Sequence, residues 1–88
     1  MAEQYDVKAK VISQKGHCAA GHKVGDEYEL GEATPAGMCP FAYFGMFPSA
    51  MVLQYGGSFP WEEDQEMTTF ACQDAENPVV FELRRVRE

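Results

Sequence analysis

Apolar and polar residues alternate in two regions near the start of the chain. In "YDVKAKVIS", four apolar residues recur at every second position: Tyr5, Val7, Ala9 and Val11. A period of two places them on one face of a β-strand and the intervening polar residues on the other. The segment "EYELG" repeats this pattern. We therefore predict two strands here, joined by the glycine-containing loop "QKGHCAAGHKVGD".

The last third of the chain has the same alternation on both sides of a short polar stretch. "MTTFACQ" places Thr68, Phe70 and Cys72 on one face, and "VVFELRRVR" is a second strand-like run. The intervening "DAENP" is rich in residues that favour turns. Two such runs around a short turn predict a β-hairpin.

The middle of the chain, Ala33 to Trp61, contains no charged residue. Pro40 suits the first position of a helix, because the N–H that proline lacks would have no partner there. Pro48 removes a hydrogen bond and clashes inside a continuous helix. We therefore predict either two short helices, Pro40–Met46 and Pro48–Gln54, or one kinked helix, which ends before two consecutive glycines.

The order of the elements is ββ–α(α)–ββ over a single domain, residues 1–88. No repeat or linker divides the chain. The simplest architecture is an α+β fold, in which an antiparallel sheet of about four strands is covered on one face by the short kinked or broken helix.

Composition and charge exclude several functional classes. The net charge of −7 disfavours nucleic-acid binding, which needs clustered Lys and Arg. The start of the chain has no signal-peptide pattern. Prolines and glycines interrupt the uncharged middle stretch, so no membrane span is expected. We predict a soluble cytoplasmic protein, and the three cysteines are expected to be reduced there.

The cysteines are the main candidates for chemistry. Cys39 precedes the predicted helix, where unpaired N–H groups favour a thiolate. Cys18 and His22 form a Cys-x3-His pair in a glycine-containing loop, and zinc accepts such mixed ligands. Cys72 lies near the end of a strand, on the face of Phe70. These positions allow the cysteines to meet at one edge of the domain, where they would suit zinc or an iron–sulfur cluster.

Three ordered motifs also resemble a family. They are "PAGMC" before the apolar segment, the "GGSFPW" loop, and Cys72-Gln73-Asp74 with "NPVVFELRRV". Together with Cys18 and "KVGDEYEL", they make the chain similar to an uncharacterised family of short prokaryotic proteins common in anaerobes. The resemblance implies a shared fold and places Cys18, Cys39 and Cys72 at the cysteine positions of the family. It implies no particular reaction.

Other functions compete with a metal site. Three separate reduced thiols, each packed as a small apolar side chain, are one alternative. A metal-free module that binds a small ligand or self-associates as a homo-oligomer is another. The aromatic residues that would line its pocket are Phe41, Phe44, Tyr55 and Trp61. A third alternative is a thiol enzyme that uses Cys39 as nucleophile and His17 or His22 as base.

Overall fold

Four strands and one helix make up the regular structure of residues 4–86, which are the residues that the computed structural model of this chain describes. In chain order they are β1 (Val7–Gln14), β2 (Glu27–Leu30), α1 (Pro40–Gln54), β3 (Met67–Ala71) and β4 (Val79–Arg85). This order confirms the predicted ββ–α–ββ arrangement.

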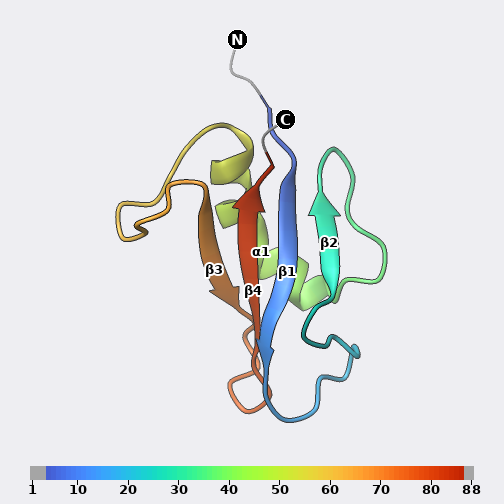
Figure 1. Cartoon of the computed structure of the whole chain (residues 1–88). Helices are drawn as coiled ribbons and strands as arrows, with labels where there is room; N and C mark the ends of the chain where they lie inside the picture. Colours follow the sequence, from blue (N-terminus) through green and yellow to red (C-terminus); the bar gives the residue numbers. More distant parts are fainter. Residues whose placement is uncertain (1–3, 87–88) are drawn as a thin grey trace.

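The strands form one antiparallel sheet in the order β2-β1-β4-β3 (Figure 1). The predicted hairpin is the β3–β4 pair. The two long strands, β1 and β4, lie side by side at the centre, although they are the first and last elements in the chain. Their register shifts between Val11 and Ser13, and the intervening Ile12 side chain is 44% exposed. The predicted α+β fold is therefore present.

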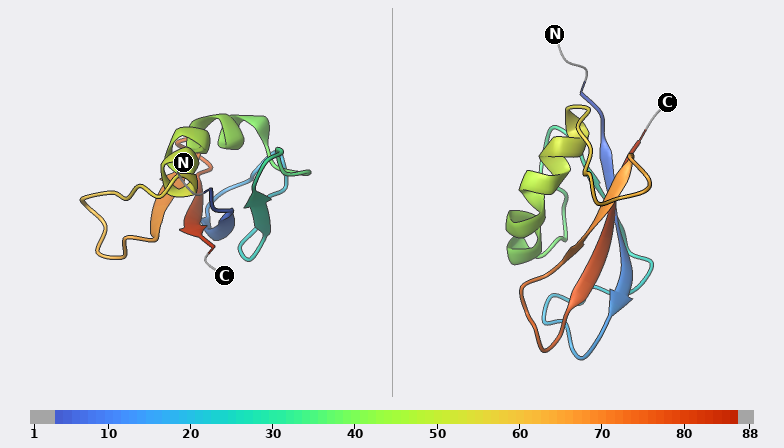
Figure 2. Two further views of the ribbon diagram at one scale, coloured as in Figure 1. Left: turned by 90° about the horizontal axis from the view of Figure 1, so that it is seen from above. Right: turned by 90° about the vertical axis from the view of Figure 1, so that its left-hand side faces the viewer.

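Helix α1 covers one face of this sheet, and the opposite face carries no element of the described chain (Figure 2). The residues between the two layers come from alternate positions of the central strands and from one side of the helix. The most deeply buried are Val7, Ala9, Val11, Val79, Phe81 and Leu83 from the sheet, and Ala42, Met46, Ala50 and Leu53 from α1. The alternation seen in the sequence thus defines the covered face.

Of the two predicted forms of the apolar segment, the structure has one continuous helix, so the prediction of two separate helices is wrong. Pro48 lies inside α1. A proline at this position leaves the carbonyl of Phe44, four residues earlier, without its helical hydrogen bond. Phe44 and Pro48 are both exposed, so water can reach this turn. The surrounding helix therefore tolerates the proline.

A close approach between α1 and β3 depends on Gly45. A Cβ atom at this position would lie 2.4 Å from Cζ of Phe70, closer than real Cβ contacts allow. The absent side chain lets the Phe70 ring pack directly against the helix. Gly45 therefore sets the spacing of these two elements.

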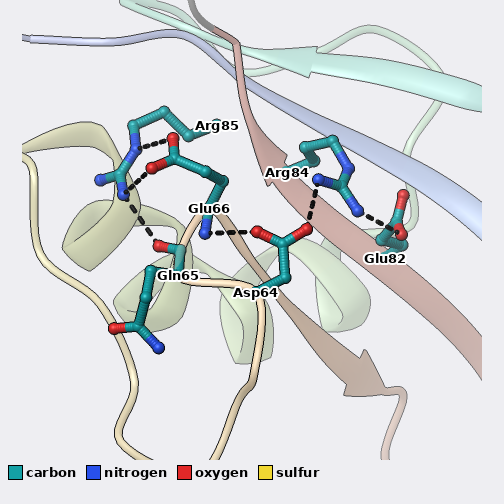
Figure 3. A network of polar contacts seen from close by, with 6 residues as sticks. All are labelled: Asp64, Gln65, Glu66, Glu82, Arg84 and Arg85. Atoms are coloured by element: carbon teal, nitrogen blue, oxygen red, sulfur yellow. Dashed lines mark hydrogen bonds and ion pairs between the residues drawn. The ribbon is translucent and has the colours of Figure 1, made fainter.

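Arg85 connects the C-terminal end of α1 to the sheet. It lies on the covered face of β4, and its side chain is only 3% exposed. Its Nε donates to the Glu66 carboxylate over 2.9 Å, and one terminal nitrogen donates to the carbonyls of Leu53 and Gly57 over 3.0 and 2.9 Å. The other terminal nitrogen donates to the carbonyl of Gln65 and to Glu66 (Figure 3). The guanidinium therefore joins β4, the end of α1 and the loop before β3.

The neighbouring Arg84 lies on the opposite, uncovered face. It pairs with Asp64 over 2.8 Å and with Glu82 over 3.2 Å, and all three side chains are partly exposed to water (Figure 3). A hydrogen bond from the backbone N–H of Glu66 lowers the pKa of Asp64, and the hydrogen bond from Arg84 lowers it further. Two adjacent arginines thus have different environments, because successive strand residues point to opposite faces.

Candidate functional site

All three cysteines line one pocket at the end of the domain where α1 begins. The pocket has a volume of about 440 Å³. Its walls come from the β1–β2 loop (Cys18, Ala19, Ala20), the start of α1 (Cys39, Phe41, Ala42) and the turn of the β3–β4 hairpin (Cys72, Gln73, Asp74, Asn77). These segments are far apart in sequence but lie at the same, lower end of the domain in Figure 1 and in the side view of Figure 2.

Cys39 occupies the position that the sequence predicts, directly before the first residue of α1. Its φ of −58° and ψ of 130° are extended rather than helical, and its carbonyl accepts the first helical hydrogen bond, from Tyr43 N–H over 3.0 Å. The thiol makes no capping hydrogen bond to this helix, which lies entirely within the described residues. The Cys39 side chain therefore lines the pocket instead of capping the helix.

His22 holds the start of α1 from the β1–β2 loop. Its Nε2 accepts a hydrogen bond from the backbone N–H of Cys39 over 3.0 Å. A nitrogen that accepts carries no proton, so Nδ1 of the neutral ring carries it and donates to the Tyr28 hydroxyl over 2.8 Å. The ring is 5% exposed and contacts Phe81 edge to face. Both ring nitrogens are thus engaged, and His22 does not line the pocket.

Tyr28 receives this hydrogen bond at the edge of the covered face. Burial raises the pKa of its hydroxyl, and the nearby charge of Asp26 adds to the effect. The neutral phenol therefore persists over a wider pH range, which preserves the partner of His22.

Cys72 lies one residue after β3, where the hairpin begins to turn. Its backbone N–H still bonds the carbonyl of Val79 over 2.9 Å. Its sulfur accepts a hydrogen bond from Val79 N–H over 3.3 Å and lies 3.9 Å from the carbonyl oxygen of Asn77. An N–H group directed at sulfur stabilises a thiolate as well as a thiol.

Asn77 joins the two loops that form the pocket. Its Oδ1 accepts from the backbone N–H of His17 over 2.8 Å, and its Nδ2 donates to Asp74 over 3.2 Å. Gly16 makes this contact possible, because a Cβ there would lie 2.1 Å from Asn77 Oδ1 and because its φ is +68°. The loop that carries Cys18 is therefore fixed to the hairpin turn that carries Cys72.

The three cysteines are free thiols, and each is partly buried. They do not already form a ligand set: within residues 4–86, no three His, Cys, Asp or Glu side chains are arranged to hold one metal ion. The structure thus places Cys18, Cys39 and Cys72 around one pocket, and metal binding by them stays a prediction. The same holds for His22, whose ring nitrogens would first have to leave Cys39 N–H and Tyr28.

The predicted aromatic pocket residues are dispersed. Phe41 lines the cysteine pocket. Phe44, Tyr55 and Trp61 are 79%, 53% and 71% exposed and lie outside its lining. The enzyme alternative needs a base close to the Cys39 thiol, but His22 meets Cys39 through its backbone N–H. The His17 side chain is exposed, and its residue contacts Asn77 through the backbone.

The sequence did not identify Asp74, Asn77 and Ala19 as pocket residues. It also did not identify Arg85 as a buried residue that joins α1 to the sheet. The turn segment "DAENP" contains two of them, and its composition predicts only a turn. For Arg85 a signal was present, because it continues the every-second-residue pattern of Val79, Phe81 and Leu83. A charged residue at the end of a buried row indicates a partner of opposite charge, here Glu66.

In the part of the chain that the structure describes, no helix combines the length and the apolar character needed to cross a bilayer. Comparisons with protein-family models, curated proteins and solved structures found no match to this chain.

Proposed function

We propose that this chain is a small metal-binding domain in which Cys18, Cys39 and Cys72 hold zinc or an iron–sulfur cluster. The observation that carries the proposal is that three cysteines from three distant segments line one pocket. A cytoplasmic location, in which thiols stay reduced, accords with this use.

Three thiolates favour soft or borderline metals over magnesium or calcium. Zinc in a structural site takes four ligands, so three cysteines leave one position. Asp74 is the pocket residue whose carboxylate suits that position, although its oxygens now accept hydrogen bonds from the turn. A water or an external ligand is the other candidate. His22 is the weaker choice, because ligation would free the start of α1.

Metal binding would draw the pocket walls together. Zinc–sulfur bonds are about 2.3 Å long, whereas the thiols now line a pocket of about 440 Å³. The hydrogen bonds of His22 to Cys39 and of Asn77 to His17 already hold the three segments next to one another. Ligation would still require movements of side chains and loops that bring the three sulfurs together.

Anaerobic purification followed by elemental analysis and visible spectroscopy tests the proposal. A zinc protein is expected to contain stoichiometric zinc, and cobalt substitution should give sulfur-to-cobalt charge-transfer bands. A cluster protein is expected to be brown, with iron and acid-labile sulfide. Protein that is metal-free in every preparation, and that takes up neither zinc nor a reconstituted cluster, would contradict the proposal.

Single-residue variants identify the ligands. Cys18→Ser, Cys39→Ser and Cys72→Ser should each lower metal content or affinity, while His17→Ala, which removes an exposed imidazole, should not. His22→Ala should reduce stability but retain the metal. If all three serine variants bind metal as the parent does, the site lies elsewhere. Circular dichroism of each variant separates lost ligation from lost folding.

A metal-free ligand pocket is the second candidate. Its volume of about 440 Å³ lies within the range of small-molecule sites. The apolar part of its lining is Ala19, Ala20, Phe41 and Ala42. If this candidate is correct, the serine variants should leave binding of an apolar fluorescent probe largely intact. Ala20→Trp, which places a large side chain in the pocket at an exposed position, should abolish it.

A further inference from the structure

The outer side of α1 carries an uninterrupted apolar stripe. We use this name for Phe41, Phe44, Phe47, Met51, Val52 and Tyr55, which are between 37% and 79% exposed. Positions 41, 44, 51 and 55, with Pro48 between them, follow one another at spacings of three and four, so they share one side of a helix. Phe47 and Val52 flank this row. The opposite side of α1 packs on the sheet through Ala42, Met46 and Leu53. The stripe therefore points away from the protein core.

We propose that this stripe is the interface of a homodimer in which α1 of one copy packs antiparallel on α1 of a second copy. This inference does not require a bound metal, although Phe41 belongs both to the stripe and to the lining of the cysteine pocket. The first argument is area. Taking about 200 Å² for each of its side chains, Met51 and Val52 included, the exposed fractions of the stripe amount to roughly 600 Å² per copy.

Two such stripes would bury roughly 1,200 Å² together, which is the lower end of stable protein–protein interfaces. The largest apolar patch on a typical monomer is about 300–600 Å², so the exposed area of the stripe lies at the upper end of that range. The stripes therefore reach the size of a small stable interface when all of their exposed area is buried.

The second argument is charge. The chain has a net charge of −7, but no charged residue occurs from Ala33 to Trp61. Two stripes can therefore meet without placing like charges in contact. A membrane surface fits less well, because interfacial helices carry Lys or Arg beside their apolar face and α1 has none. A second copy supplies a matching uncharged surface.

The third argument concerns orientation. The stripe is wide at its start, with Phe41 and Phe44, and narrower towards Met51 and Val52. A two-fold axis near Pro48 would place Phe44 of one copy opposite Met51 of the other, so that large side chains meet smaller ones and fill the interface evenly. Antiparallel helix dipoles also attract.

Sedimentation velocity over a range of concentrations tests the dimer. The parent chain is expected to pass from monomer to dimer as concentration rises. Phe44→Glu should raise the dissociation constant by on the order of 100-fold. The matched control is Trp61→Glu, which changes a 71% exposed aromatic outside the stripe and should leave the constant unchanged.

Mixing two variants tests the orientation. Phe44→Glu and Met51→Lys should each be monomeric alone, and their mixture should form a heterodimer, because Glu and Lys then face each other and the native Met51 and Phe44 meet. Circular dichroism confirms that each variant is folded. A parent chain that stays monomeric at all concentrations, or a Phe44→Glu variant that dimerises normally, would overturn the proposal. Monomers that co-sediment with anionic phospholipid vesicles would also overturn it and assign the stripe to lipid.

Discussion

Replacing Arg85 by methionine should be among the most damaging single changes in this protein. Methionine has a similar length and preserves packing, so the change isolates the guanidinium. Five hydrogen bonds are lost, three of them to backbone carbonyls of Leu53, Gly57 and Gln65. The Leu53 carbonyl keeps the hydrogen bond from Gly56 N–H, whereas the Gly57 and Gln65 carbonyls lose the bond from Arg85. A buried carbonyl left without a partner costs about 1 kcal/mol.

The Glu66 carboxylate also loses its hydrogen bonds from Arg85, but its side chain is 34% exposed and regains part of its hydration. Breaking a buried ion pair costs about 3–5 kcal/mol, and this partial exposure places Arg85→Met towards the lower end. A domain of this size has a total stability of about 4–13 kcal/mol. The variant is therefore expected to lose a large share of its free energy of unfolding.

Urea unfolding followed by circular dichroism measures the loss, and Arg84→Met is the matched control. Arg84 is the same residue type in the adjacent position, but its side chain is 44% exposed, so its ion pairs should contribute about 1 kcal/mol or less. Arg85→Lys should recover only part of the stability, because an ammonium group cannot reach the same set of acceptors. Equal losses for the Arg84 and Arg85 methionine variants would refute this reasoning.

Two further predictions concern the helix–sheet contact and the acid limb of stability. Gly45→Ala should lower the free energy of unfolding in urea by about 1–3 kcal/mol despite the higher helix propensity of alanine, because the added Cβ meets Phe70. This loss should be smaller in a Phe70→Ala background. An unchanged loss there would contradict the steric explanation. The pKa of Asp64 lies below its ordinary value of 3.8, so this group stabilises the fold above that pH and the stabilisation is lost as pH falls through the lowered pKa. Asp64→Asn should therefore make unfolding midpoints less sensitive to pH below about 4, and a parallel pH dependence in parent and variant would show that Asp64 is not responsible.

The boundaries of the helix and the hairpin were predictable because their causes are local. Pro40 begins α1, and the alternation of apolar residues identifies the covered face of β1. The continuity of α1 through Pro48 was not predictable in the same way. It depends on packing against the sheet, which compensates for one missing hydrogen bond.

In the candidate site, too, features with local causes were predictable and those that depend on tertiary packing were not. The sequence indicated that Cys39 stands at a helix start and that Cys72 shares a face with Phe70, because both follow from neighbouring residues. It left the two nitrogens of His22 unassigned, since their partners are the backbone of Cys39 and the hydroxyl of Tyr28. Contacts of this kind depend on how a loop lies over the sheet.

By itself, then, the sequence determined the order and type of the elements, the apolar faces of β1, β2 and β3, and the place of Cys39 directly before α1. Only the tertiary structure decided that Cys18, Cys39 and Cys72 line one pocket. It also decided that Arg85 is buried, whereas the adjacent Arg84 is 44% exposed. Periodicity and turn residues act over a few positions along the chain, whereas the pairing of β1 with β4 brings together groups from opposite ends of the sequence.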